Sequence, residues 1–153
     1  MTTNSFFIIA HNIRSLYNIG TVFSTADALG LDQLFLTGYS AQPPRKEISK
    51  VALGAENSVP WQYHKNISPL LAKLKKQGVK IIALETNSRA INYLDFRPDF
   101  PLALLIGNEV RGLSQSLLKQ ADEIIFLPMK GQKESLNVGV AMAVAAYQIS
   151  SKK

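Results

Sequence analysis

Five short apolar segments, separated by stretches with helical spacing, constrain the fold of this chain more than any other feature. The segments are FFIIA (6–10), QLFLT (33–37), KIIAL (80–84), LALLI (102–106) and EIIFL (123–127). Each has the length and apolar content of a strand. Because strands that alternate with helices form parallel sheets covered by those helices, the sequence predicts an α/β fold with one parallel sheet.

The segments between these strands predict the helices. We expect helices over residues 20–29, 67–77, 114–120 and 135–151, and a further short one over 48–53. Gly30 and Gly78 are expected helix ends, and Ser68 and Ser114 are expected helix starts. The segment 38–47 carries two adjacent prolines and three charges, so we expect a surface loop there.

Composition limits the class of protein. A chain of 153 residues, 46% of them hydrophobic, suits a single domain over 1–153. The absence of Cys and the presence of only two His argue against a disulfide scaffold and a metal site. The longest uncharged apolar run, 138–147, is half of the ~20 residues that cross a bilayer, and the amino terminus lacks a signal-peptide pattern. We therefore expect a cytoplasmic protein that needs no membrane and no metal.

The chain is basic. Seventeen Lys and Arg against eleven Asp and Glu give a formal charge of +6, which favours a polyanion such as RNA as partner. Solvated surface lysines on a metabolite-binding protein would give the same charge, so both interpretations stay open. The candidate phosphate contacts are Arg14, Arg45, Lys46, Lys50 and Arg111.

The segment LLIGNEVRGLS (104–114) has the glycine spacing of a phosphate-binding loop. Such a loop needs Lys where this chain has Leu113, and no GxGxxG pattern occurs elsewhere, so a nucleoside triphosphate or a dinucleotide is not the expected ligand. Two alternatives remain: a turn that approaches a different ligand, with Asn108, Glu109 and Arg111 beside it, or an ordinary strand-to-helix connection.

Two other segments follow predicted strands and lead into helices. Ser135-Leu136-Asn137 precedes a helix of small apolar residues, which must pack closely against neighbours or a partner chain. Arg14 and Asn18 lie ahead of the first helix, where free N–H groups attract a phosphate or carboxylate. Simple helix capping would explain both segments equally well.

Taken together, NIRSLYNIGTVFSTADALG, LLIGNEVRGLS and LPMKGQKESLNVGVAMA resemble the three signature segments of the SpoU/TrmH-type RNA methyltransferases of the SPOUT superfamily, and KVALGAENSVPW (50–61) is also similar. The resemblance covers residues 6–149. It implies a SPOUT fold with a carboxyl-terminal trefoil knot and a homodimer. It also implies a pocket for S-adenosylmethionine and a minimal member of the family without a separate RNA-binding extension.

The expected activity is methyl transfer from S-adenosylmethionine to a ribose 2′-OH of tRNA or rRNA. The expected catalytic residues are Arg14, Asn18 and Glu109, and the expected RNA contacts are Arg14, Arg45, Lys46 and Arg111. The residues that it assigns to the cofactor are Leu105, Ile106, Gly107, Leu127, Met129, Ser135, Leu136 and Asn137.

One position departs from the family pattern. The family has an arginine six residues after the asparagine of the first segment, and counting from Asn18 reaches Ser24. A serine hydroxyl is neither cationic nor basic enough to replace arginine. Three explanations of this departure stay open. Either Arg14 or Arg111 enters the pocket in place of the missing arginine, or Glu109 acts as a base with weaker activity. In the third explanation, the chain is a knotted RNA-binding dimer with little catalysis.

Overall fold

A single seven-stranded parallel sheet forms the centre of the molecule. The computed structural model describes residues 1–153, and every pair of neighbouring strands in it is parallel, in the order β3-β2-β1-β6-β4-β7-β5. The strands are β1 (Phe6–His11), β2 (Gln33–Thr37), β3 (Trp61–His64), β4 (Lys80–Leu84), β5 (Ile91–Asn92), β6 (Leu102–Ile106) and β7 (Glu123–Phe126). The predicted α/β class and parallel sheet are confirmed.

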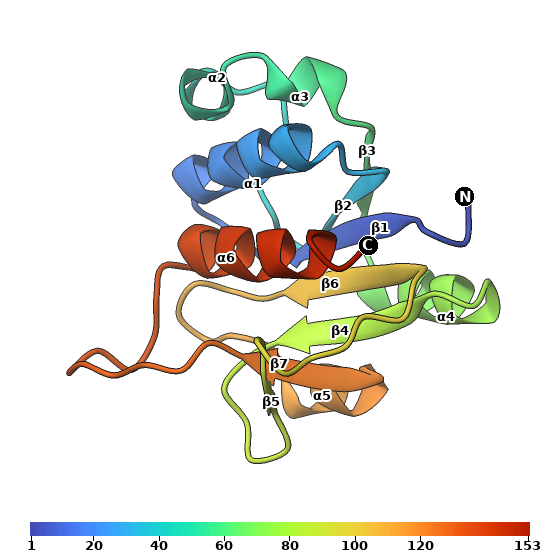
Figure 1. Ribbon diagram of the computed structural model, residues 1–153. Coiled ribbons are helices and arrows are strands. Elements are labelled where there is room, and N and C mark those ends of the chain that lie inside the picture. Colours follow the sequence, from blue (N-terminus) through green and yellow to red (C-terminus); the bar gives the residue numbers. More distant parts are fainter.

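Helices cover both faces of this sheet (Figure 1). One face packs against α1 (Leu16–Leu29), α2 (Lys46–Ala52), α3 (Ala55–Ser58) and α6 (Val138–Ser150), and the other against α4 (Ile67–Lys76) and α5 (Gln115–Gln120). Two separate apolar clusters result. The first holds the inner side chains of α1, α2, α3 and α6, and the second holds those of α4 and α5.

The strand β6 contributes to both clusters because successive side chains of a strand point to opposite faces. Leu104 and Ile106 pack on the side of α1 and α6, whereas Ala103 and Leu105 pack on the side of α4 and α5. All of them are buried. The last side chain of β6, Ile106, therefore points toward the face that α6 covers.

Two helices begin elsewhere than the sequence predicts. The first begins at Leu16 instead of residue 20, because the Ser15 hydroxyl accepts a hydrogen bond from the Asn18 backbone N–H at 3.1 Å. The last begins at Val138 instead of residue 135, because Asn137 is its N-cap. The predicted start at Ser114 is confirmed, since its hydroxyl accepts from the Leu117 N–H.

The sequence also missed three short elements and misplaced one cap. The fourth helix begins after Asn66, so Ser68 is not its start. The two missed strands, β3 and β5, lie at the two edges of the sheet, and no residue of β3 is fully buried. The missed helix α3 has only four residues. Edge strands and single helical turns carry too few apolar positions to form a detectable pattern.

The carboxyl-terminal segment returns across the molecule after β7. In Figure 1 the chain leaves β7, extends away from the sheet and comes back as α6, which lies beside α1. The first apolar cluster includes Met142, Ala145 and Ala146 of this helix. A carboxyl-terminal knot needs such a return path, and the knot itself stays a prediction. None of the helices combines the length and the apolar character that a membrane-spanning segment requires.

Candidate functional site

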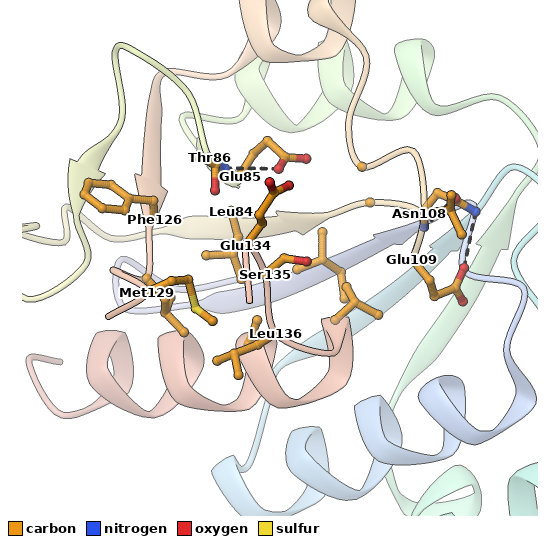
Figure 2. A pocket seen from close by; sticks show the side chains of 17 residues that line it. Leu84, Glu85, Thr86, Asn108, Glu109, Phe126, Met129, Glu134, Ser135 and Leu136 are labelled. Carbon is orange, nitrogen blue, oxygen red and sulfur yellow. Dashed lines mark hydrogen bonds between the residues drawn. The ribbon is translucent and has the colours of Figure 1, made fainter. Parts of the chain in front are cut away.

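A pocket opens at the carboxyl ends of β4, β6 and β7, where side chains from four segments of the chain meet (Figure 2). It offers about 740 Å³ of space, part of it open to solvent. The four segments are the end of β4, the turn after β6, the segment after β7 and the start of α6. This edge of a parallel sheet is where ligands are expected.

The turn after β6 closes on itself. A side chain on Gly107 would meet the carbonyl carbon of Gly112, because the added Cβ would lie 2.7 Å from it. The Asn108 Oδ1 accepts hydrogen bonds from the backbone N–H groups of Val110 and Arg111, each at 2.9 Å. The Gly112 N–H donates to the Asn108 carbonyl oxygen at 2.9 Å. The glycine at 107 is therefore required by the turn itself.

Glu85 fastens this turn from the end of the neighbouring strand. Its Oε2 accepts a hydrogen bond from the Leu113 N–H at 3.0 Å, and its Oε1 accepts one from the Thr86 N–H at 3.0 Å. Gly112 has a φ of 64°, and a Cβ there would overlap Glu85 Oε2. The sequence interpretation missed Glu85. The rule that ligands bind beyond the carboxyl ends of parallel strands also applies to the predicted strand 80–84, where it points to Glu85.

The structure brings most of the predicted cofactor residues to one pocket. Its lining includes Ile106, Gly107, Leu127, Met129, Ser135 and Leu136. Leu105 and Asn137 are not part of the lining: Leu105 is fully buried on the opposite face of the sheet, among the side chains of α4 and α5. The sequence interpretation did not assign several other lining residues to the cofactor, namely Leu84, Glu85, Thr86, Phe126, Glu134, Val138 and Ala141.

Asn137 joins the two helices beside the pocket. Its Oδ1 accepts hydrogen bonds from the N–H groups of Gly139 at 2.9 Å and Val140 at 3.2 Å, which caps α6. Its Nδ2 donates to the Asn18 Oδ1 at 3.1 Å. Asn18 is only 4% exposed and does not line the pocket. These two asparagines thus fix the start of α6 against α1.

Glu109 connects the turn after β6 to the start of α1. Its Oε1 accepts from the Ser15 N–H at 2.9 Å, and its Oε2 accepts from the Asn108 Nδ2 at 3.2 Å. Figure 2 shows Glu109 and Asn108 at one end of the pocket, apart from Met129 and Leu136. Its two hydrogen bonds leave Glu109 further acceptor capacity, because a carboxylate has about four lone-pair sites.

The basic candidates lie at different distances from this end of the pocket. Arg14 precedes Ser15, and its guanidinium lies over the Tyr39 ring, 5.1 Å from the ring centroid. Arg111 is exposed in the turn and does not line the pocket. Ser24 is exposed on α1 and is not among the lining residues either. Arg14 does not line the pocket either, so the structure places neither of the two candidate replacement arginines in it; Arg14 adjoins Ser15, whose N–H donates to Glu109.

The remaining basic candidates lie at the start of α2. Arg45 and Lys46 are exposed, and neither lines the pocket. The Arg45 Nε is 3.4 Å from a carboxylate oxygen of Glu47, and both side chains are solvent-accessible. Such a surface ion pair contributes little to stability and leaves the arginine able to bind phosphate.

His11, at the end of β1, is partly buried. Its Nδ1 lies 2.8 Å from the Thr37 Oγ1, and burial lowers the pKa of the imidazole below its ordinary value of 6.5. Desolvation has this effect because it disfavours the charged form. The structure contains no group of three or more His, Cys, Asp or Glu side chains that could hold a metal ion.

Three known proteins are similar to this chain in sequence or in structure. The tRNA (guanosine(18)-2′-O)-methyltransferase of Escherichia coli K12 is 27% identical over 95% of this chain, which spans 63% of that enzyme. A solved structure that concerns the 2-OH methylation of C/U34 on tRNA is 26% identical, with a TM-score of 0.88, over 99% of this chain and 97% of that one. AviRb from Streptomyces viridochromogenes in complex with the cofactor AdoMet shares the fold, with 23% identity and a TM-score of 0.90 over 99% of this chain and 62% of that one.

The family model of the SpoU rRNA methylases matches residues 5–147, which is nearly the whole chain. The matched range includes all the pocket-lining segments and both asparagines that join α1 to α6. The chain belongs to the SpoU rRNA methylase family.

Proposed function

We propose that this chain is an S-adenosylmethionine-dependent methyltransferase that methylates a ribose 2′-OH of RNA, with tRNA as the favoured substrate over rRNA. The observation that carries the proposal is the likeness to the structure concerned with 2-OH methylation on tRNA, which extends over 99% of this chain and 97% of that one. The pocket, lined by residues of the second and third signature segments and of the end of β4, supports it.

The lining of the pocket fits the chemical groups of S-adenosylmethionine. Apolar side chains of Ile106, Leu127, Met129 and Leu136 suit an adenine ring and the methylene groups beside the sulfur. Glu85 and Glu134 supply negative charge beside them, which suits a sulfonium and an ammonium group. When bound, S-adenosylmethionine supplies an electrophilic methyl group on a positively charged sulfur. Asn137 and Leu105 support this lining without being part of it.

The opposite end of the pocket binds the acceptor nucleotide in this proposal. Glu109 accepts the proton of the ribose hydroxyl, and Arg14 holds a neighbouring phosphate with its planar set of N–H donors. Asn18 keeps α1 and α6 in register and so holds the two ends of the pocket together. In this arrangement Arg14 takes the phosphate-binding part of the role that the family assigns to the position of Ser24.

The RNA extends from this end over a basic surface formed by Arg14, Arg45, Lys46 and Arg111, all of them exposed or partly exposed. The formal charge of +6 supports such a surface through counterion release. An RNA substrate also agrees with the cytoplasmic location that the sequence predicts.

We also propose that the chain works as a homodimer through α6. Val140, Val144 and Tyr147 are 49%, 38% and 53% exposed. Their spacing of four and three residues places them on one side of the helix. Leu136, which is 41% exposed, extends this apolar surface to the pocket. A contiguous exposed apolar surface of this kind marks an interaction site.

Methyl transfer to RNA tests the function directly. Purified protein is incubated with radiolabelled S-adenosylmethionine and bulk tRNA or rRNA, and the digested RNA is analysed by mass spectrometry for 2′-O-methylated nucleosides. The unaltered chain is compared with Ser24→Arg and with Ser24→Gln, a control of similar polarity without charge. We expect the unaltered chain to methylate tRNA, and Ser24→Arg to raise the rate while Ser24→Gln does not.

The methyl-transfer assay and two binding measurements separate the alternatives. Transfer by Ser24→Arg alone would overturn the enzymatic function of the unaltered chain and leave a cofactor- and RNA-binding dimer. Base methylation in place of ribose methylation would overturn the proposed acceptor. If calorimetry detects no heat on addition of S-adenosylmethionine or S-adenosylhomocysteine, the cofactor site is wrong. RNA binding that does not weaken as salt rises would favour a metabolite-binding protein.

A further inference from the structure

An exposed aromatic ring lies beside the acceptor end of the pocket. Tyr39 follows β2 and is 50% exposed. Its hydroxyl oxygen accepts a hydrogen bond from the Asn108 Nδ2 at 3.3 Å. Because Asn108 lines the pocket, a single hydrogen bond connects this ring to the pocket wall. The ring is therefore held beside the pocket while about half of the residue stays in contact with water.

The loop that carries Tyr39 is fixed before any ligand arrives. The Tyr39 N–H donates to the Asn12 Oδ1 at 3.0 Å. Gly38 has a φ of 66°, and a side chain there would overlap the same Asn12 oxygen. The buried Ser40 donates its hydroxyl to the Ala10 carbonyl at 2.9 Å and accepts from the Ile13 N–H at 2.9 Å. The loops after β1 and β2 are thus interlocked, and the ring is preorganised.

Arg14 completes the arrangement. Its guanidinium lies over the Tyr39 ring, and its nitrogens form no ion pair and no side-chain hydrogen bond within the chain. An arginine stacked on an aromatic ring keeps its five N–H donors available at the edge of the guanidinium plane. The pair therefore offers a flat apolar surface for a base and a set of donors for a phosphate, which together match one nucleotide.

We propose that Tyr39 is the platform on which a base of the acceptor RNA stacks, with Arg14 holding the adjoining phosphate; this inference rests on the proposed RNA methyltransferase function. The stacked base belongs to an unpaired nucleotide, since a base inside a duplex already has both faces covered by its neighbours. Tyr39 binds substrate in this proposal and takes no part in proton transfer. The platform selects loops and single strands over duplex RNA.

Two variants at one position separate the ring from its hydroxyl. Tyr39→Phe keeps the ring and loses only the hydrogen bond to Asn108, whereas Tyr39→Leu keeps the apolar bulk and loses the aromatic face. We expect Tyr39→Leu to raise the Kd for a single-stranded RNA oligonucleotide by about tenfold or more, the range for one base stacked on an aromatic side chain. Tyr39→Phe is expected to raise it by about threefold at most.

The readouts include effects that a purely structural role would not produce. In an oligonucleotide containing 2-aminopurine, stacking on the ring is expected to change the fluorescence with the unaltered chain and with Tyr39→Phe, but not with Tyr39→Leu. The slope of log Kd against log salt concentration is expected to stay the same in Tyr39→Leu, because stacking releases no counterions. Affinity for S-adenosylmethionine, measured by calorimetry, and the melting temperature report on the integrity of the pocket and the fold.

Three outcomes with the single-stranded oligonucleotide alone would overturn the platform. These are an unchanged Kd in Tyr39→Leu, an equal loss in Tyr39→Phe and Tyr39→Leu, and a loss that disappears at high salt. Failure of the proposed function looks different, because the unaltered chain would then bind RNA without transferring methyl groups. In that case the comparison of oligonucleotide affinities still tests Tyr39. Equal weakening of duplex and single-stranded RNA would also contradict the proposal.

Discussion

At the scale of single residues, two glycines with the same backbone conformation differ in what surrounds them. Gly112 has a φ of 64° and Gly30 a φ of 61°. Nothing lies within 4 Å of a Cβ added to Gly30, whereas a Cβ on Gly112 would overlap the Glu85 carboxylate. Any side chain at either position is strained by about 1–2 kcal/mol. Only at Gly112, which lines the pocket, would the added Cβ also overlap a neighbouring side chain.

We therefore expect Gly112→Ala to lower the free energy of unfolding by at least about 1 kcal/mol more than Gly30→Ala. It should also weaken S-adenosylmethionine binding, because Glu85 and the turn both line the pocket. Urea denaturation and calorimetry measure the two effects. Removing the carboxylate in the double variant Glu85→Ala/Gly112→Ala should recover part of the loss. Equal destabilisation by the two glycine substitutions would mean that Glu85 does not fix the turn.

The sequence predicted which segments reach the pocket better than it predicted which side chains do. In LALLI every residue is apolar, so the pattern does not reveal that Ile106 faces the pocket and Leu105 the opposite side of the sheet. Strands buried on both faces lack the alternation that would distinguish the two. Glu85 was missed for another reason, since a single carboxylate after a strand has no motif around it.

At the scale of elements, the cap of α6 connects helix stability to the pocket. Asn137 accepts from two N–H groups at the helix start and donates to the buried Asn18. We expect Asn137→Ala to lower the free energy of unfolding by about 2–3 kcal/mol, because the cap is lost and a buried acceptor loses its partner. Asn137→Asp should cost less than Asn137→Ala, since its carboxylate keeps the capping oxygens at the helix amino terminus, although it also loses the hydrogen bond to Asn18.

A second helix cap, whose residue does not line the pocket, supplies the control. Ser114 caps α5 through one hydrogen bond to the Leu117 N–H at 3.2 Å. Ser114→Ala should cost about 1 kcal/mol and leave S-adenosylmethionine affinity unchanged. Asn137→Ala should weaken that affinity as well, because residues on both sides of it line the pocket. Unchanged cofactor affinity in Asn137→Ala would separate the cap from the site and contradict this account.

Helix boundaries depended on such caps, which explains where the sequence prediction failed. The pattern of apolar residues placed the starts of the first and last helices near residues 20 and 135, whereas the side chains of Ser15 and Asn137 set them at Leu16 and Val138. The five central strands were predicted within one residue at each end. Their apolar runs coincide with the buried part of the sheet, where composition and burial are most tightly connected.

At the scale of the whole molecule, strand order was beyond reach of the sequence pattern. The pocket depends on β6 lying between β1 and β4, and on β7 lying beyond β4. Apolar periodicity says nothing about which strands pair. The resemblance to the SpoU/TrmH-type enzymes supplied the fold, and the match to the family model over residues 5–147 confirmed that resemblance. Only the assembled sheet brings Glu85, Glu109 and Ser135 to one cavity.

The proposed homodimer gives the last prediction, because the exposed side of α6 has no partner within one chain. Val144 lies in the middle of the apolar surface formed by Val140, Val144 and Tyr147. Val144→Glu would bury an unpaired carboxylate in the interface, so we expect the dimer Kd to rise by at least about 100-fold. Leu53→Glu is the control, since Leu53 is 85% exposed and is the C-cap residue of α2, outside the apolar surface of α6. Sedimentation velocity should detect dimers of the unaltered chain and of Leu53→Glu, and monomers of Val144→Glu. A monomeric unaltered chain, or a Val144→Glu variant that still dimerises, would place the apolar side of α6 outside any self-association interface.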